Sequence, residues 1–392
     1  MSLVADESPL ALTDERFARF AKVEWWQQQR LRDARVLVAG AGALGNEVVK
    51  NLALLGVGNV VIADMDTIEV SNLTRSCLFR EKDAGSFKAA CAARAALDLY
   101  PQMNVQALNV NITAALGLGW IRWAEIVIGA LDNREGRVFL NASCARIGRP
   151  WIDGGIEVLQ GVARGFHAPE TACYECTMSE IDWQVINTRR SCSMLARRAL
   201  AHGGVPTTPL TASIVGAIQA QEVVKYLHGL PALFGRGFVY EGAHHGSYVV
   251  SYPIDPGCPW HEGAPPIEQV REWDSDTPFN VIWQRAEELL GGCDAIDLGR
   301  EIVEVLQCVA CGRRRPILRS VEAVSEDDAR CDGCGADSAP EFLHSIGRGS
   351  EHRQRTPREL GLPAWDIVWA RYGDRFLGFE LAADAAAAMG GE

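Results

Sequence analysis

Residues 35–66 constrain the fold of this chain more than any other stretch. They open with a short apolar run, Val36–Val38, as in a buried parallel strand. A glycine turn follows, and an apolar pattern with helical spacing then runs to Gly56. A second apolar run, Val60–Ala63, ends on Asp64. The glycines have the spacing G-x-G-x-x-G and are Gly40, Gly42 and Gly45. This order of strand, glycine turn, helix, strand and acid predicts an α/β fold with a mainly parallel sheet.

The same arrangement predicts a nucleotide site at the glycine turn. Glycines allow a tight turn, and they let backbone N–H groups at a helix N-terminus approach a phosphate or a ribose. Asp64 follows Gly45 by 19 residues, which places its carboxylate for hydrogen bonds to ribose hydroxyls. The alternative interpretation is a glycine-rich turn that only packs a helix against a sheet.

Residues 64–88 indicate the kind of nucleotide. This loop-rich span contains a Ser-Asn-Leu-x-Arg sequence that ends at Arg75, and it closes on Lys88 before the next helix pattern. An ordinary NAD-binding domain needs neither of these cations after its ribose acid. Two cations can hold a triphosphate, and an arginine can do so with two parallel hydrogen bonds. The span therefore favours ATP over a dinucleotide.

Taken together, these motifs resemble the ThiF/MoeB superfamily, whose best-known branch is the ubiquitin-activating enzymes. The resemblance covers roughly residues 14–265 and is specific, because several spaced motifs agree in order. The chain departs from the family pattern at Ser76, where the family usually has glutamine. The matching residues are Gly40, Gly42, Gly45, Asp64, Asp66, Ser71, Asn72, Leu73, Arg75, Lys88 and Asp132.

The resemblance implies a Rossmann-like adenylation domain that uses ATP and Mg²⁺. In such a domain Asp64 would bind the ribose, with Asp66 and the three glycines beside it in the nucleotide site. Arg75 and Lys88 would neutralise charge on the phosphates, and Asn72 would orient the reacting phosphate.

The resemblance also implies roles for three positions outside this span. Asp132 would hold Mg²⁺ between phosphate oxygens, although the residues alone also allow it to be the N-cap of a helix over 135–147. Gly154 and Gly155 would let the tail of a protein substrate approach closely. Arg19 would reach the ATP phosphates of the partner subunit in a homodimer. Without the family context, Arg19 would be a solvated arginine on an amphipathic helix.

Charge and composition argue against several classes of protein. The formal net charge is −12, whereas binding to nucleic acid needs a basic face. The first residues have no basic segment and no long apolar segment, so we expect no signal peptide. No apolar run approaches the roughly 18 residues of a membrane span. Twelve cysteines in a chain of this size favour metal binding or chemistry over disulfides, and we expect a cytoplasmic protein.

The cysteine spacing predicts two zinc sites. Near the C-terminus, two C-x-x-C knuckles are separated by 19 residues, and each knuckle places two sulfurs on one side of a tight turn. The second set pairs a C-x-x-C knuckle with a Cys-Pro-Trp-His sequence, where the family often has another C-x-x-C; histidine is an ordinary zinc donor. The alternatives are buried thiols in the first set and a surface histidine in the second. The sets are Cys308, Cys311, Cys331 and Cys334, and Cys173, Cys176, Cys258 and His261.

Cys192 is the candidate nucleophile among the remaining five cysteines. It follows Arg189 and Arg190, which favour the thiolate and thereby lower the pKa of the thiol. Ubiquitin-activating enzymes carry their thioester cysteine in the corresponding crossover. The other four are Cys77 and Cys293, the next candidates, and Cys91 and Cys144, whose helix patterns indicate core positions.

We expect three regions along the chain. Residues 1–265 form the adenylation domain, with a short crossover at about residues 177–208 that carries Cys192. Residues 266–305 form a helical linker region, and residues 306–392 form a small zinc-ribbon-like module and a tail. Because the large ubiquitin activators insert a whole domain at this crossover, the resemblance implies the compact, homodimeric kind.

The resemblance thus implies an activating enzyme for a ubiquitin-like protein, of the kind a bacterial ubiquitin-like conjugation system would use. It would adenylate the C-terminal glycine of the modifier, form a thioester on Cys192 and pass the modifier to a conjugating-enzyme-like partner. Three alternatives stay open: a ThiF/MoeB-type sulfur-carrier adenylyltransferase without a catalytic thioester, an NAD-dependent oxidoreductase, and a catalytically silent subunit that scaffolds an active partner. The oxidoreductase would leave Arg75 and Lys88 without a role.

Overall fold

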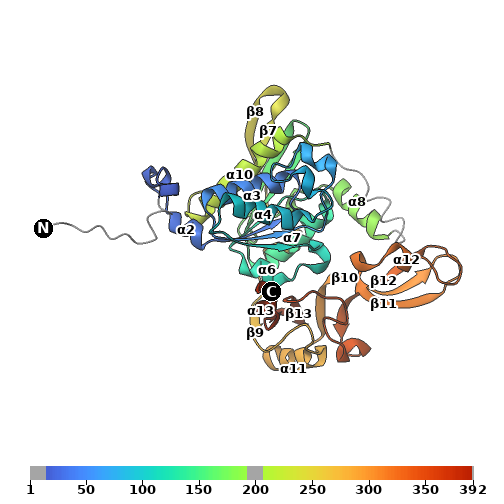
Figure 1. The fold of residues 1–392 in the computed structure, drawn as a ribbon. Helices are drawn as coiled ribbons and strands as arrows, with labels where there is room; N and C mark the ends of the chain where they lie inside the picture. The colour runs from blue at the N-terminus through green and yellow to red at the C-terminus, as the bar shows by residue number, and fades with distance from the viewer. Residues whose placement is uncertain (1–14, 192–205, 391–392) are drawn as a thin grey trace.

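The computed structural model describes residues 15–191 and 206–390. In that part of the chain the strands form an eight-stranded sheet and a six-stranded sheet (Figure 1). The eight-stranded sheet has the order β3-β2-β1-β4-β5-β6-β7-β8. Its strands are β1 (Arg35–Ala39), β2 (Asn59–Ala63), β3 (Asn104–Leu108), β4 (Ile126–Gly129), β5 (Trp151–Glu157), β6 (Gln160–Phe166), β7 (Arg236–Glu241) and β8 (Gly246–Ser251).

The first five strands of this sheet run parallel, and β6, β7 and β8 continue it with antiparallel pairing. The apolar runs predicted at 36–38 and 60–63 lie in the central strands β1 and β2, where they are fully buried. The carboxyl ends of β1, β2, β3 and β4 therefore meet at one edge of the sheet, which is where open α/β sheets bind their ligands. The predicted α/β fold with a mainly parallel sheet is confirmed.

Helices cover both faces of the sheet. The helices α3, α4 and α10 pack on one face in a core with β1 and β2, while α5, α6 and α7 pack on the other face. No helix among the described residues is long and apolar enough to cross a membrane. The helices are α2 (Gln28–Asp33), α3 (Ala43–Leu55), α4 (Lys88–Leu99), α5 (Ile112–Ala115), α6 (Leu118–Trp123), α7 (Arg134–Ile147), α8 (Glu180–Ser191) and α10 (Pro209–Leu227).

The six-stranded sheet belongs to the C-terminal part of the chain. Its order is β11-β10-β13-β14-β9, and β12 pairs with β10 outside this path. Its strands are β9 (Ile267–Val270), β10 (Ala295–Cys308), β11 (Arg314–Ser320), β12 (Ser338–Gly347), β13 (Ile367–Tyr372) and β14 (Arg375–Leu381), and its helices are α11 (Phe279–Leu290), α12 (Glu326–Ala329) and α13 (Asp384–Met389).

This sheet differs from the helical linker expected over residues 266–305. That span contains α11, but it also contains β9 and most of β10, and the boundary expected at residue 306 lies inside β10. The strand β9 pairs in parallel with β14, so that Ile267 lies opposite Gly378. A short strand whose partner lies more than a hundred residues away gives little local signal. The zinc-ribbon-like module is one end of a larger C-terminal domain.

The two sheets share one hydrophobic core. Leu37 and Val127 on the eight-stranded sheet lie in the same buried cluster as Trp365 and Trp369 of the C-terminal domain. The indole of Trp365 lies so close to Gly119 of α6 that a Cβ there would be 2.4 Å from a ring atom. The C-terminal domain is therefore packed into the adenylation domain rather than appended to it.

Candidate active site and metal centres

The glycine turn lies between β1 and the N-terminus of α3. Gly40 has φ +99°, a conformation that favours glycine, and a Cβ there would lie 2.4 Å from the Ala130 oxygen. A Cβ on Gly45 would lie 2.0 Å from the Gly40 oxygen, so this position must also be glycine for the helix to pack on the turn. Around Gly42, in contrast, no heavy atom lies within 4 Å of a built Cβ. The turn is thus closed on its packing side and open on the side where a phosphate would approach the helix N-terminus.

Asp64 is oriented by the backbone on both sides of it. Its Oδ2 accepts a hydrogen bond of 2.6 Å from the Ala41 N–H in the glycine turn, and its Oδ1 accepts one of 2.8 Å from the Asp66 N–H. Burial raises the pKa of Asp64, and the two N–H donors and the nearby Lys88 oppose that shift. The carboxylate is thus held against the turn, in the position expected for a ribose ligand.

Lys88 and Arg75 are both held by partners near this edge. The Nζ of Lys88, at the start of α4, lies 2.8 Å from Asp66 Oδ2, and the Lys88 side chain is only 13% exposed. Arg75 donates to the Ser71 carbonyl oxygen at 3.1 Å, at the end of the short 3₁₀ helix Val70–Thr74. Asn72 accepts the Glu69 N–H with its side-chain oxygen. Its NH₂ group is therefore the group with which it could contact a phosphate.

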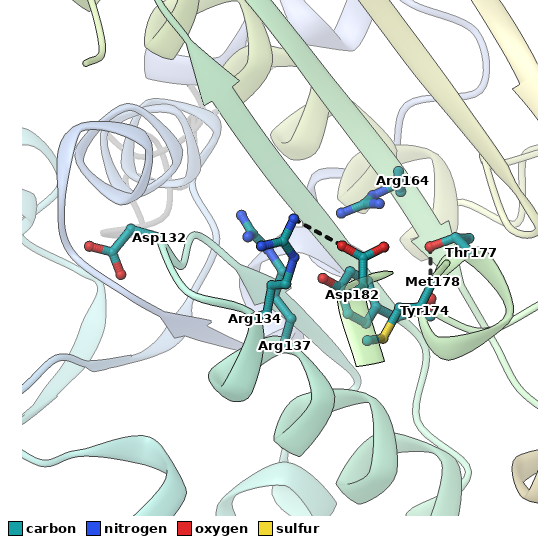
Figure 2. Close-up of a pocket in the computed structure, with 8 residues that line it drawn as sticks. All are labelled: Asp132, Arg134, Arg137, Arg164, Tyr174, Thr177, Met178 and Asp182. Carbon is teal, nitrogen blue, oxygen red and sulfur yellow. Dashed lines mark hydrogen bonds and ion pairs between the residues drawn. The ribbon is translucent and has the colours of Figure 1, made fainter. Parts of the chain in front are cut away.

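Asp132 follows β4 and is exposed. The N-cap of α7 is the next residue, because the side-chain oxygen of Asn133 accepts the Gly136 N–H at 2.7 Å. The capping interpretation of Asp132 is therefore wrong. Figure 2 shows the Asp132 carboxylate apart from the arginine and aspartate side chains of α7 and α8. An exposed carboxylate at a strand end, without a capping duty, fits a Mg²⁺ ligand.

A cleft of about 600 Å³ brings Arg75 and Asp132 together beside the start of α3. It continues from there over β5, β6 and β7, where Gly154, Gly155 and Gly161 line it. Asp64, Asn72 and Lys88 are not part of this lining.

A buried ion cluster that no sequence motif indicates lies beneath the cleft. Asp153 of β5 is fully buried, and its two oxygens accept from Arg137 Nε at 2.9 Å and Arg164 Nε at 3.0 Å. Burial raises the pKa of Asp153, but the two guanidinium groups outweigh it and the net shift is downward. With two arginines around one carboxylate, the cluster carries a net positive charge. The sequence signal for this cluster is the position of Arg137, five residues after Asp132.

The same arginines and Asp132 line a second cavity of about 360 Å³ (Figure 2). One wall of it is an ion pair between Arg134 of α7 and Asp182 of α8, with 2.9 Å between the charged atoms. The helix α8 begins the crossover, so this ion pair joins the crossover to the turn that follows Asp132. Neither Arg134 nor Asp182 belongs to a motif that is recognisable in the sequence.

Cys192 lies outside the described residues, as do the residues after it up to 205, and nothing is described of the Arg189 and Arg190 side chains. Cys77 and Cys293, the other candidate nucleophiles, lie within the described residues. Burial and the nearby Glu47 raise the pKa of Cys77 to about 11. Cys293 is fully buried, and burial together with nearby acids raises its pKa to about 11 as well. Cys91 and Cys144 are buried, as predicted.

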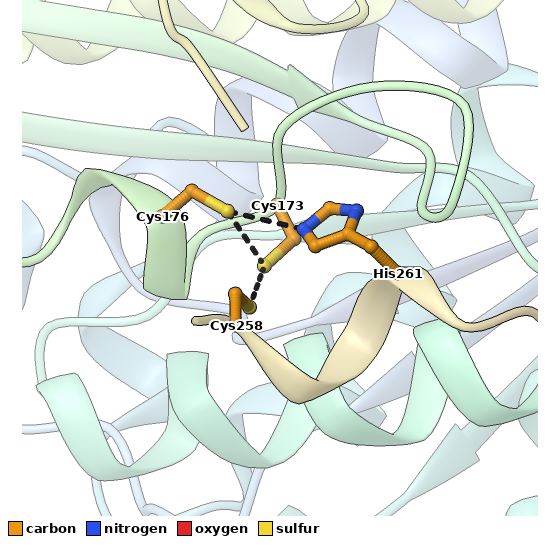
Figure 3. Close-up of side chains that lie close together, drawn as sticks. All are labelled: Cys173, Cys176, Cys258 and His261. Carbon is orange, nitrogen blue, oxygen red and sulfur yellow. Dashed lines mark hydrogen bonds between the residues drawn. The ribbon is translucent and has the colours of Figure 1, made fainter. Parts of the chain in front are cut away.

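The set of Cys173, Cys176, Cys258 and His261 gathers at the start of the crossover (Figure 3). Cys173 Sγ lies 3.7 Å from Cys176 Sγ and 3.5 Å from Cys258 Sγ, and Cys176 Sγ lies 3.1 Å from Nε2 of His261. A tetrahedral zinc with Zn–S bonds of about 2.3 Å needs sulfurs about 3.8 Å apart, so these spacings fit zinc. Nδ1 of His261 faces the Pro169 carbonyl oxygen at 3.4 Å, which favours the tautomer with Nε2 free to bind a metal.

The set of Cys308, Cys311, Cys331 and Cys334 lies at the far end of the C-terminal domain. Its two knuckles meet with 3.5 Å between Cys308 Sγ and Cys334 Sγ and 3.7 Å between Cys311 Sγ and Cys331 Sγ. The backbone N–H of Cys311 donates to Cys308 Sγ, and that of Gly333 donates to Cys331 Sγ. Such N–H donors support thiolate ligands. In each set the four ligand atoms lie within 4.8 Å of one another, as zinc requires.

We expect freshly purified protein to contain about two zinc ions per chain, one for each cluster. Cys308→Ser should reduce this to about one, because a tetrathiolate site loses a ligand. Cys77→Ser, which changes a thiol outside both clusters, is the control and should retain both ions. Elemental analysis that finds no zinc in the wild-type protein would contradict both assignments.

Arg19 lies far from the glycine turn of its own chain. Phe17 packs at the opposite end of α3, where its ring lies 2.4 Å from a Cβ built on Gly56. A helix of 13 residues is about 20 Å long. The exposed Arg19 side chain, two residues further on, therefore cannot span to Gly42 of the same chain.

The fold and the open glycine turn define a nucleotide-binding protein of the Rossmann-like class. A family model described as the ThiF family matches residues 14–251, and this chain belongs to that family. It is 31% identical over 238 residues to a sulfur carrier protein adenylyltransferase of Thermus thermophilus, across 59% of this chain and 83% of that protein. It is 32% identical over 234 residues to a SAMP-activating enzyme E1 of Haloferax volcanii, across 59% of this chain and 82% of that protein.

A solved structure shares the fold. The structure of E. coli MccB with ATP has a TM-score of 0.52 and 22% identity, and the match covers 63% of this chain and 74% of that one. The family membership and the relatives together support adenylyltransferase activity for this chain. The family match ends at residue 251, so it leaves the C-terminal domain outside.

Proposed function

We propose that this chain activates the C-terminal glycine of a ubiquitin-like protein by adenylation with ATP. The observation that carries the proposal is the cleft beside the glycine turn. It holds Arg75 and Asp132 at one end and continues over β5, β6 and β7, where Gly154, Gly155 and Gly161 are among its lining residues. A Cβ built on Gly155 would meet only Val162 Cγ1 at 3.3 Å and the Arg137 guanidinium at 3.8 Å, so this position leaves room for the backbone of an extended, narrow tail. Such a tail would present its terminal carboxylate at the phosphate end.

The proposed chemistry needs positioned charge more than proton transfer. A carboxylate oxygen of the substrate attacks the α-phosphorus of ATP, and the bond from this phosphorus to the pyrophosphate oxygen breaks. Asp64 holds the ribose, and Arg75 and Lys88 neutralise the charge that develops on the phosphates. Asn72 orients the reacting phosphate with its NH₂ group. Mg²⁺, with Asp132 as its ligand, would supply further positive charge at the phosphates.

In the second proposed step the Cys192 thiolate attacks the acyl carbon of the adenylate. The carbon–sulfur bond forms, the bond to the phosphate oxygen breaks and AMP leaves with the electron pair. The thioester keeps the acyl group reactive for transfer to a conjugating-enzyme-like partner. The raised pKa values of Cys77 and Cys293 support Cys192 as the nucleophile, because neither competing thiol is ionised near neutral pH.

The second candidate function is adenylation of a sulfur-carrier protein without the thioester, which the Thermus relative favours. Both candidates use the same nucleotide site. We place the enzyme in the cytoplasm, with a protein substrate rather than nucleic acid, in keeping with the net charge of −12.

Isotope exchange between pyrophosphate and ATP tests the shared step. Exchange should appear only when a β-grasp protein with a C-terminal glycine is added, since the acyl-adenylate forms reversibly. A gel-stable adduct that a reducing agent removes would then favour the thioester route over the sulfur-carrier route. Lack of exchange with every β-grasp protein encoded near the gene would contradict the proposal.

We further propose that the enzyme works as a homodimer in which Arg19 serves the partner's ATP. The distance of Arg19 from its own glycine turn supports this arrangement. Arg19→Ala and Lys88→Ala proteins should each be nearly inactive alone. Mixed and allowed to exchange subunits, they should regain about one quarter of wild-type activity, because half of the dimers then contain one intact site. Wild-type activity in a protein that is monomeric by light scattering would contradict this proposal.

A further inference from the structure

Arg300 of the C-terminal domain has its side chain buried against the adenylation domain. Arg300 lies in β10, where the pairing with β12 is irregular between Asp297 and Ile302 and Gly299 has φ +68°. Such a bulge redirects side chains out of the regular alternation of a strand. The Arg300 side chain is only 2% exposed.

The guanidinium of Arg300 joins two segments that are far apart in sequence. Its Nε donates to Asp366 Oδ2 at 2.9 Å, and its two NH₂ groups donate to the carbonyl oxygens of Thr113 at 2.9 Å and Leu116 at 2.5 Å. Asp366 also accepts the backbone N–H of Leu118 at 2.9 Å. An arginine and an aspartate of the C-terminal domain thus bind three backbone groups in one short stretch of the adenylation domain.

That stretch runs from the end of β3 to the start of α6, and it contacts the backbone of Asp64 and the first turn of the helix after Asp132. At its start, the Asp64 N–H donates to the Leu108 carbonyl oxygen at 3.0 Å, at the carboxyl end of β3. Four residues on, Ile112 is 6% exposed and its Cδ1 lies 3.5 Å from a Cβ built on Gly136, in the first turn of α7 after Asp132. The segment 108–118 therefore lies behind the nucleotide site and touches the supports of both carboxylates.

We propose that Arg300 is a positioning residue for the nucleotide site, and that the C-terminal domain is a working part of that site. By holding the Thr113 and Leu116 carbonyls, Arg300 fixes the segment against which Asp64 and the turn after Asp132 are placed. The inference rests on the proposed use of ATP. It goes beyond the ThiF family match, which ends before the first strand of this domain.

The test compares two pairs of substitutions in the full-length protein. Arg300→Met alone would leave Asp366 as a buried unpaired charge and could prevent folding, so the test variant is Arg300→Met with Asp366→Asn. Asparagine keeps an oxygen that can accept the Leu118 N–H. The matched control is Arg122→Met with Glu380→Gln, which removes the ion pair between α6 and β14 in the same interface. Both variants lose one arginine and one carboxylate charge.

The readouts are thermal unfolding, the calorimetric affinity for MgATP, and the KM for ATP and for the protein substrate in pyrophosphate exchange. The test variant should bind ATP about 10- to 100-fold more weakly, with the KM for the protein substrate within twofold of wild type. The control should keep wild-type ATP affinity at a comparable unfolding temperature. Wild-type ATP affinity in the folded test variant, or an equal loss in both variants, would overturn the inference. If the wild-type protein binds MgATP but shows no pyrophosphate exchange with the protein substrate, that result counts against the proposed substrate and not against the role of Arg300.

Discussion

Replacing Lys88 with alanine should lower pyrophosphate exchange by about 100- to 1,000-fold, because a positioned cation is lost where charge accumulates in the transition state. We expect a similar loss for Arg75→Ala, which also removes a cation, and for Asp132→Ala, which removes the proposed Mg²⁺ ligand; both residues line the cleft. The fold should survive in the Lys88 variant. Its partner Asp66 is 51% exposed, so the substitution leaves no buried unpaired charge.

The control for this experiment is Lys82→Ala. Lys82 is exposed on the preceding 3₁₀ helix, Glu81–Asp83, and it has no proposed contact with the nucleotide. The Lys82→Ala substitution removes one positive charge from the same region as Lys88→Ala, and we expect pyrophosphate exchange in this variant to stay at the wild-type level. Far-ultraviolet circular dichroism would establish that all variants are folded. Wild-type exchange in the Lys88, Arg75 and Asp132 variants would overturn the assignment of the ATP site.

Replacing Cys192 with alanine should abolish transfer of the modifier to a conjugating enzyme while pyrophosphate exchange continues. The reason is that the acyl carbon has no thiol acceptor, whereas adenylate formation uses other residues. With ATP, Mg²⁺ and the modifier, the wild-type protein should form an adduct that a reducing agent removes. Cys192→Ser should form a thiol-resistant ester or no adduct.

Cys77→Ser is the control for the thioester experiment, since Cys77 is the exposed thiol nearest in sequence to Arg75. Its pKa of about 11 leaves little thiolate at neutral pH, and the adduct should persist in this variant. Transfer that continues in Cys192→Ala would rule out Cys192 as the acyl carrier. The sulfur-carrier route would then be preferred.

The central part of the fold was predictable because its signals are local. The run that became β1, the turn at Gly40 and the helix that became α3 each follow from a few adjacent residues. The cysteine spacing also sufficed to bring both ligand sets together, because C-x-x-C knuckles fix the geometry of their own turns. These features depend little on the rest of the chain.

The C-terminal sheet and part of the site were not predictable in this way. The strand β9 depends on pairing with β14 across more than a hundred residues, and its four residues have no distinctive pattern. Asp153 reads as an isolated acid in the sequence and becomes an ion-cluster centre only when β6 brings Arg164 opposite it. At the start of α7, Asp132 and Asn133 are both good caps by type, and only the hydrogen bond to Gly136 distinguishes them.

The shared core also has a consequence for how such a chain can evolve. The recognisable family sequence ends at residue 251, yet the partners of the Leu37 side of the sheet include Trp365 and Trp369, more than a hundred residues later. A gene rearrangement that joined residues 14–251 to an unrelated neighbour would therefore expose an apolar face that the ancestral chain had covered. Inheritance of the family segment and of the C-terminal domain should be linked, so the natural unit of exchange in this lineage is larger than the unit recognised by homology.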